Sequence, residues 1–257
     1  MNTECQIYLG TILLERNRWG KNDRRPSFLV SDWTERIAGD GFDGLELWEN
    51  HALMADGDER ERLRTGPCPV VLLNSYAGCE DEDRPARQQT AELAAFFDAA
   101  GMKFNFGKDP ERQDRYIENV RAWANMFKPG YRMLSENHRG TTTADAELAA
   151  GTYERLDGVN IGGIIHFGND EEEYRKRCGW YGRYLTHIHC KLSQDDGTVM
   201  GEDAVHHRLE LLREFGFNGT FTIEFTEGMR VDNVTIDDLY RNAVRDLRLL
   251  RKCLASG

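Results

Sequence analysis

The feature that most constrains the fold of this chain is a regular alternation of strand-like and helix-like segments along almost its whole length. Short runs rich in β-branched and aromatic residues predict strands, and the segments between them carry apolar residues at helical spacing. The predicted strands lie at residues 6–12, 44–48, 69–76, 103–107, 131–137, 159–166, 185–192 and 220–225. Eight strand–helix units in 257 residues favour a single (β/α)8 barrel domain of residues 1–257, since such barrels take about 250 residues.

The segments between the strands also carry helix start and stop signals. Predicted helices lie at residues 90–100, 112–127, 143–155, 171–181, 203–215 and 236–254, and Ser31 and Thr235 stand where helices are expected to begin. Two phrases, AGDGFDGLEL at 38–47 and REFGFNGTFTIEF at 213–225, repeat a helix-ending glycine before a strand. This is the usual αβ connection of parallel α/β proteins. An open doubly wound sheet is the main alternative, although no Gly-x-Gly-x-x-Gly follows the first strand.

The composition is that of an ordinary globular chain with an acidic balance. Hydrophobic residues make up 40% and charged residues 30%. The net charge of −11 disfavours binding to nucleic acid, because an acidic surface repels phosphate backbones. No run approaches the roughly 18 apolar residues of a membrane span, and the N-terminus has no signal-peptide pattern. None of the six cysteines forms a Cys-x-x-Cys pair, so we expect a cytoplasmic location and no membrane contact.

Ionisable residues interrupt the apolar runs near the ends of the later predicted strands. They are Glu136, His166, His189 and Glu224. A barrel collects the C-terminal ends of its strands at one mouth, and a buried carboxylate there is costly unless it is paired or bound to metal. Two carboxylates and two imidazoles therefore predict one divalent metal ion, with Mn²⁺ as the first expectation and Co²⁺, Fe²⁺, Zn²⁺ or Mg²⁺ also open. The alternative is a set of buried ion pairs with imidazoles satisfied in the core.

Three further ionisable residues are candidates for catalysis. His138 lies two residues after Glu136 and is a candidate general base, because an imidazole titrates near neutral pH. Lys191 could polarise a carbonyl or stabilise an enolate, and Glu46 could act as the base or bind sugar hydroxyls. Each has a structural alternative: a substrate or ligand hydrogen bond for His138, a solvated loop position for Lys191, and an ion pair for Glu46.

Other residues at predicted strand ends are expected to line a sugar-binding pocket, since aromatic rings pack on the C–H faces of sugars. The substrate-binding candidates are Trp48, His51, Asn74, Asn105 and His187, and Tyr76 and Lys108 lie at comparable positions. His187, two residues before His189, could instead orient a metal ligand from behind.

Several phrases together resemble a known superfamily. SENHRG at 135–140, HFGN at 166–169, THIHCK at 186–191, TIEF at 222–225 and GFDGLELW at 41–48 are similar to motifs of the xylose-isomerase-like TIM barrels. That superfamily includes sugar phosphate isomerases/epimerases, ketose 3-epimerases and endonuclease-IV-type enzymes. The resemblance extends over nearly the whole chain. It implies metal ligands at Glu136, His189 and Glu224 and, in an Asp-x-Gly-Asn-like phrase, at position 166.

Two positions depart from the pattern that the resemblance implies. The superfamily usually has Asp where this chain has His166, so the site would carry one negative charge less. Ketose 3-epimerases use a pair of Glu residues as acid and base, one of them six residues after the first ligand, and here that position is Thr142. A strict ketose 3-epimerase is therefore disfavoured.

The expected function follows from the metal site and the resemblance. We expect a metal-dependent isomerase or epimerase that acts on a sugar or keto-sugar by removing the proton next to a carbonyl. The main alternative is a metal-dependent lyase that cleaves C- or O-linked 3-keto-glycosides by β-elimination. Further alternatives are a non-catalytic sugar-binding subunit and an endonuclease-IV-like phosphodiesterase, which would need a multinuclear zinc site. We expect a small carbohydrate as partner, and assembly as a homo-oligomer or with a small partner subunit.

Overall fold

The strands of the chain close into one parallel barrel. A computed structural model describes residues 5–168, 170–193, 198–231 and 233–256. Its strands are β1 (Ile7–Gly10), β2 (Gly44–Trp48), β3 (Val70–Asn74), β4 (Gly101–Phe104), β5 (Arg132–Glu136), β6 (Ile161–His166), β7 (Leu185–Lys191) and β8 (Thr220–Phe225). They follow one another around the barrel in chain order, and β8 pairs with β1. This topology confirms the predicted (β/α)8 barrel and rules out the open doubly wound sheet.

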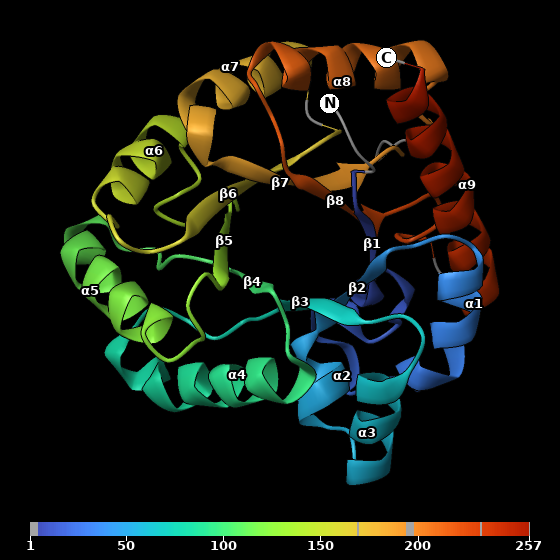
Figure 1. The fold of residues 1–257 in the computed structure, drawn as a ribbon, viewed down its shortest axis with the longest axis horizontal. Coiled ribbons are helices and arrows are strands. Elements are labelled where there is room, and N and C mark those ends of the chain that lie inside the picture. Colours follow the sequence, from blue (N-terminus) through green and yellow to red (C-terminus); the bar gives the residue numbers. More distant parts are fainter. Residues whose placement is uncertain (1–4, 169, 194–197, 232, 257) are drawn as a thin grey trace.

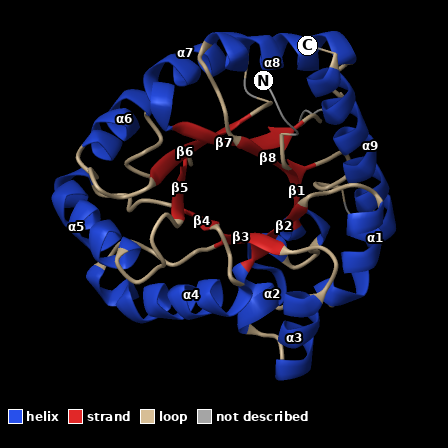
Figure 2. Ribbon diagram, viewed as in Figure 1, coloured by secondary structure: helices blue, strands red, loops and turns tan. Residues whose placement is uncertain are grey.

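The helices form an outer ring around the strands (Figures 1 and 2). They are α1 (Thr34–Gly39), α2 (Glu49–Leu53), α3 (Gly57–Thr65), α4 (Arg84–Phe97), α5 (Gln113–Ala124), α6 (Ala146–Glu154), α7 (Glu171–Tyr181), α8 (Glu202–Glu214) and α9 (Ile236–Ala255). Among the described residues, no helix is both long and apolar enough to span a bilayer.

Local sequence signals account for several of the turns and helix ends. Gly41 and Gly216 follow α1 and α8 with φ angles of 97° and 70°, a left-handed conformation that suits glycine, as the two repeated phrases predict. Thr235 begins α9 as predicted: its hydroxyl accepts the Asp238 N–H, and the Asp238 carboxylate accepts the Thr235 N–H. Ser31 does not begin a helix, because its hydroxyl donates to Glu59 and α1 starts three residues later.

Some element bounds differ from the prediction. α4 begins at Arg84 rather than at residue 90; Pro85 suits its first turn, but the polar residues 84–89 show no apolar period. β4 covers Gly101–Phe104 rather than 103–107. It begins with a glycine because a Cβ at that position would meet the Arg132 carbonyl oxygen, and a glycine is not a sequence signal for a strand. α2 and α3 are short and largely polar, so periodicity did not predict them.

The strand register brings ionisable side chains to one end of the barrel. His166 of β6 pairs with His189 of β7, and His189 pairs with Thr222 of β8. Glu136 ends β5 beside Ile164 of β6. Because neighbouring parallel strands carry these residues at corresponding heights, their side chains converge at the C-terminal mouth, where (β/α)8 barrels place their functional sites.

Candidate metal centre

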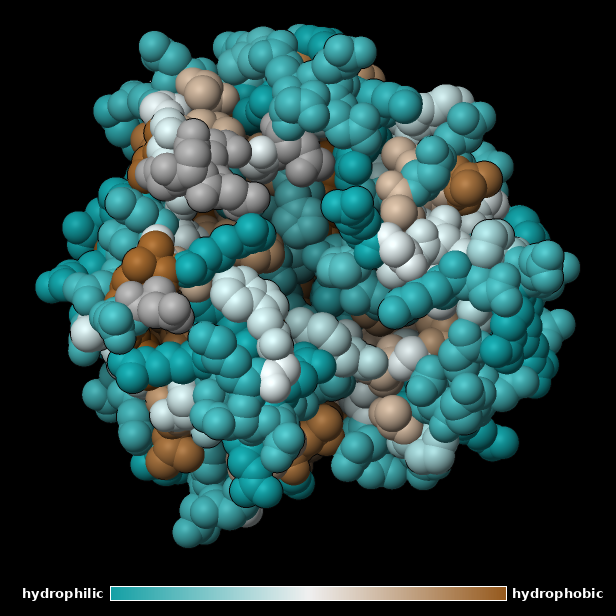
Figure 3. Space-filling model, turned by 180° about the vertical axis from the view of Figure 1, so that it is seen from behind, coloured by the Kyte–Doolittle hydropathy of each residue, from teal (hydrophilic) through white to brown (hydrophobic). Residues whose placement is uncertain are grey.

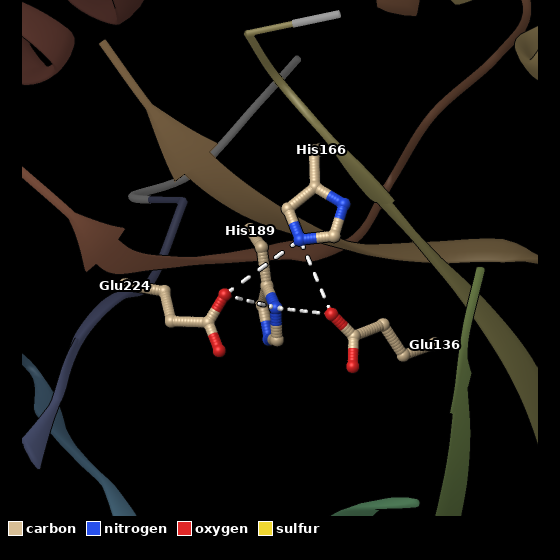
Figure 4. Close-up of side chains that lie close together, drawn as sticks. All are labelled: Glu136, His166, His189 and Glu224. Atoms are coloured by element: carbon tan, nitrogen blue, oxygen red, sulfur yellow. Dashed lines mark ion pairs between the residues drawn. The ribbon is translucent and has the colours of Figure 1, made fainter. Parts of the chain in front are cut away.

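Four side chains from neighbouring strands meet at the C-terminal mouth (Figure 4). Glu136 and His166 are the last residues of β5 and β6, whereas His189 and Glu224 lie within β7 and β8. One potential ligand atom of each lies within 4.8 Å of the others. The structure thus brings together all four residues that the sequence predicts as metal ligands.

The separations within this cluster fit a shared cation. His166 Nε2 lies 3.2 Å from Glu136 Oε1 and 3.7 Å from Glu224 Oε2. His189 Nδ1 lies 2.9 Å from Glu224 Oε2 and 3.9 Å from Glu136 Oε1. Ligand atoms that each lie about 2 Å from one ion stand roughly 3 to 4 Å apart, so little rearrangement is needed to bind one.

Two buried atoms of the cluster face each other without a well-aligned hydrogen bond. They are Nδ1 of His189 and Oε2 of Glu224, which lie 2.9 Å apart on side chains that are 0% and 7% exposed. They attract each other as an ion pair only while the imidazole is protonated. A divalent cation between them would satisfy both, and two carboxylate oxygens with two imidazole nitrogens suit such an ion. The cluster can therefore hold a metal ion.

A second group of polar side chains supports His189 from inside the barrel. Glu46 is fully buried and accepts hydrogen bonds from Asn74 Nδ2 at 2.8 Å and from Thr222 Oγ1 at 2.8 Å. Its Oε2 also lies 3.1 Å from His189 Nε2. Because a carboxylate can only accept, Nε2 of His189 carries a hydrogen, so Nδ1 is the atom that could offer its lone pair to a metal once its own proton is displaced.

His187 lies one layer deeper than His189. Its Nδ1 is 2.7 Å from Thr220 Oγ1 and its Nε2 is 3.0 Å from Thr222 Oγ1. Burial lowers the pKa of His187 to about 4, so the ring is neutral at neutral pH. The structure therefore places His187 behind the metal centre, within the hydrogen-bond network of Thr222, and not on the cavity wall where it was expected to bind substrate.

Opposite charges keep the carboxylates ionised despite burial. Burial favours a neutral carboxyl, but Lys103 and His166 hold the pKa of Glu136 well below its usual range. His189 does the same for Glu46 and Glu224. Burial lowers the pKa of His189, and the neighbouring Glu224 and Glu46 carboxylates more than reverse this. Without a metal the cluster is thus a set of ionised carboxylates and protonated imidazoles, and metal binding would displace those protons.

Lys103 is a functional candidate that the sequence analysis passed over. It lies in β4, is 2% exposed, and places Nζ 2.8 Å from Glu136 Oε2. The adjacent Glu136 and Tyr76 raise the pKa of Lys103 against the opposing effect of burial, so it stays charged. The signal used for the other strands, an ionisable residue interrupting an apolar run, was present here in the phrase GMKF.

A cavity of about 850 Å³ opens above the cluster. Figure 3 shows a hollow near the centre of this face, bordered mostly by hydrophilic residues. Of the residues predicted to act on or bind substrate, three line it: His138, Lys191 and Asn105. Nδ1 of His138 lies 2.9 Å from the Arg139 carbonyl oxygen, which can only accept, so Nδ1 carries the hydrogen and Nε2 keeps the lone pair.

Five of the predicted residues do not line this cavity: His187, described above, and Glu46, Trp48, His51 and Asn74. His51 is engaged on both ring nitrogens, 2.9 Å from Thr11 Oγ1 and 3.0 Å from Glu15 Oε2. Trp48 is fully buried and packs edge-on against His51. Tyr76 does line the cavity, whereas Lys108 does not, and Asn169 of the HFGN phrase lies outside the described residues.

Comparison with known proteins identifies the fold through solved structures. No protein-family model matches the sequence, and no curated protein does. The probable 3-DHS dehydratase AsbF of Bacillus anthracis superposes with a TM-score of 0.68 at 16% identity, over 95% of this chain and 98% of that chain. D-psicose 3-epimerase of Clostridium cellulolyticum H10 gives a TM-score of 0.69 at 14% identity, over 97% and 99%.

A third similar structure is a xylose isomerase-like TIM barrel protein of Mycobacterium smegmatis, solved in complex with magnesium. Its TM-score is 0.66 at 15% identity, over 97% of this chain and 98% of that chain. At these identities the likeness shows the fold alone. The chain has the same (β/α)8 barrel fold as these proteins, which is the fold that the resemblance of its motifs implied.

Proposed function

We propose that the protein is a divalent-metal-dependent enzyme that isomerises or epimerises a sugar or keto-sugar by removing the proton next to a carbonyl. The observation that carries this proposal is the convergence of Glu136, His166, His189 and Glu224 beneath an open cavity, with two of their buried atoms lacking a well-aligned hydrogen bond. The dehydratase and epimerase with the same fold support an enzymatic role.

The four clustered residues would hold the metal, with Mn²⁺ as our first expectation. When bound, such an ion supplies Lewis-acid polarisation of a substrate carbonyl. Glu46 would fix the ring of His189 through Nε2, as carboxylates commonly do for metal-bound histidines. We therefore propose a positioning role for Glu46 rather than the role of a base, because three donors occupy its carboxylate and none of its surface is exposed.

His138 is the proposed general base. It is exposed in the cavity, and its Nε2 holds the lone pair that can accept a proton from carbon. Lys103 and Lys191 line the same cavity and would stabilise negative charge that develops on the substrate oxygen. Returning the proton to a different carbon or face gives isomerisation or epimerisation.

Thr142 keeps a lyase as the second candidate. It stands where ketose 3-epimerases of the superfamily carry an acid/base Glu, and its hydroxyl is buried without a hydrogen bond. With no carboxylate there to return the proton, the carbanion formed after proton removal could instead expel a β-substituent. Cleavage of a 3-keto-glycoside by β-elimination would then begin with the same proton transfer to His138.

Incorporation of deuterium from solvent tests both candidates. The metal-loaded protein is incubated in D2O with D-fructose, D-fructose 6-phosphate, D-fructuronate and a 3-keto-glucoside, and the products are analysed by NMR. We expect exchange at the carbon next to the carbonyl, and a loss of about 100-fold or more in His138→Gln, because a positioned base contributes about 10²–10⁴. His207→Gln is the matched control, because His207 of α8 is half-buried and does not line the cavity.

Two results would contradict the proposal. One is the absence of exchange and elimination with all of these compounds, neutral and anionic, which is what a non-catalytic sugar-binding subunit predicts. The other is exchange that continues at the native rate after the metal has been stripped with a chelator.

A further inference from the structure

The cavity above the metal centre gathers positive charge on an acidic protein. Among the described residues, six basic side chains and two acidic ones, Glu136 and Glu224, line it. The basic residues are Arg24, Lys103, Arg139, Arg177, Lys191 and Arg230. Over the whole chain acids outnumber bases by 44 to 33. The ratio of basic to acidic residues at the mouth is therefore the reverse of that of the whole chain. A concave site concentrates the resulting positive potential on a ligand that enters it.

The proposed metal does not leave the floor of the cavity negative. Glu136, Glu224 and Glu46 behind His189 contribute three negative charges, and Lys103 beside Glu136 contributes one positive charge. A divalent ion with neutral His166 and His189 brings this sum to about zero, whereas a carboxylate in place of His166 would make it negative. The positive charge that an anion would meet is therefore that of the basic side chains around the mouth.

Arg24 brings a second cation to the cavity wall. Its guanidinium lies 4.0 Å from the centre of the Tyr76 ring and 5.3 Å from that of Trp48, so two aromatic side chains hold it in place. No ion pair joins Arg24 to a carboxylate in the described parts of the chain. A guanidinium held by its faces keeps its in-plane N–H groups for a ligand, and these match the paired oxygens of a carboxylate or phosphate.

Two more arginines lie on the rim after later strands. Arg139 follows β5 and is exposed, and within the described residues it has no carboxylate in ion-pair range. Arg177 of α7 is half-buried and shares its Nε with Glu173 at 2.8 Å. Both side chains face the same cavity as Arg24. The positive charge is thus distributed around the mouth and does not depend on a single loop.

We propose that the substrate of this site is an anion, a sugar derivative that bears a carboxylate or a phosphate, and that Arg24 binds the anionic group. The proposal rests on the proposed function, because it names the substrate class of the same site. Lys103 and the metal would face the reacting end of the molecule, and Arg24 would select for its charge.

Calorimetric titration of the metal-loaded protein at low ionic strength tests this inference. The probes are inorganic phosphate and acetate, which need no turnover. We expect at least one of them to bind, and Arg24→Gln to weaken that binding about tenfold or more, as the loss of a charged hydrogen bond does. Arg16→Gln, an exposed arginine of the same loop that does not line this cavity, should bind the probe like the native protein.

Each outcome bears on one claim. Stronger binding of phosphate indicates a phosphorylated substrate, and stronger binding of acetate a carboxylate. If neither anion binds, or if Arg24→Gln binds as tightly as the native protein, the substrate is not selected by charge at Arg24. That failure leaves metal-dependent proton exchange intact. Conversely, Arg24-dependent anion binding without any exchange would reject the proposed reaction and keep the charge assignment.

Discussion

The Glu46 carboxylate shows how a buried charge serves a site without facing its cavity. It accepts hydrogen bonds from Asn74 and Thr222, and it lies 3.1 Å from Nε2 of His189. From the sequence alone, Glu46 and Glu136 look alike, since each interrupts an apolar strand. They differ in their position along the barrel axis. Glu136 is the last residue of β5, whereas Glu46 lies two residues before the end of β2 and is fully buried.

Replacing Glu46 with Gln should weaken metal binding. The amide offers His189 one acceptor and one donor in place of two acceptors, so the ring loses its fixed tautomer. Loss of such a supporting carboxylate typically costs about 10–100-fold in metal affinity. Titration of the chelator-stripped protein with Mn²⁺ measures this. Glu35→Gln, an exposed glutamate on α1, is the control. Unchanged affinity in Glu46→Gln would mean that Glu46 does not position His189.

The sequence predicts which strand residues are ionisable, but not which way their side chains point. Ionisable residues within predicted strands could be found because burial makes them costly, and Glu136, His166, His189 and Glu224 do converge. The sequence does not predict whether such a side chain faces the cavity or the barrel interior, because this depends on the length and register of the strands. Asn74 illustrates this, since it ends β3 and yet donates to the buried Glu46 inside the barrel.

At the scale of secondary structure, β6 shows how glycine allows the barrel and helix layers to meet. A Cβ on Gly163 would lie 2.6 Å from the buried ring of Tyr181 in α7. Since both the strand and the ring are enclosed, neither can move aside cheaply. This contact holds α7 against β6, and β6 ends in His166 of the metal centre.

Gly163→Ala should therefore destabilise the protein by about 1–3 kcal/mol, the usual cost of overpacking a core. Gly151→Ala is the matched control, because Gly151 lies within α6 with nothing within 4 Å of an added Cβ. In α6 the replacement should stabilise the protein by about 0.5–1 kcal/mol, because alanine has a higher helix propensity than glycine. Urea unfolding gives both values. If both replacements changed the free energy of unfolding equally and with the same sign, the Tyr181 ring would not exclude a side chain at position 163.

Element identity was predicted well where apolar periodicity was strong, as in α5, α8 and α9, which match the predicted helices within a few residues. It failed in α3, where GDERERLRT places few apolar residues on any face. That helix is fixed by its Asp56 cap and by tertiary contacts such as the Ser31–Glu59 hydrogen bond. Periodicity cannot report such contacts, because they join segments distant in sequence.

At the scale of the whole molecule, the net charge of the chain does not predict the charge around the cavity. The chain carries −11 overall, yet most of the charged residues described around the mouth are basic. Composition alone cannot reveal this, because closure of the barrel decides which loops meet. The same closure places side chains from β5, β6, β7 and β8 around one point, which is the basis of the metal assignment.

The metal content of the purified protein tests this assignment most directly. Elemental analysis of the native chain, Glu136→Gln and His189→Ala, each after identical dialysis, gives the number of ions per chain. Arg16→Gln serves as a control outside the cluster. We predict one divalent ion per native chain and its loss from both ligand variants, with correct folding checked by circular dichroism. Native protein that neither contains metal nor gains thermal stability from Mn²⁺, or folded variants that keep the full metal content, would contradict the metal centre.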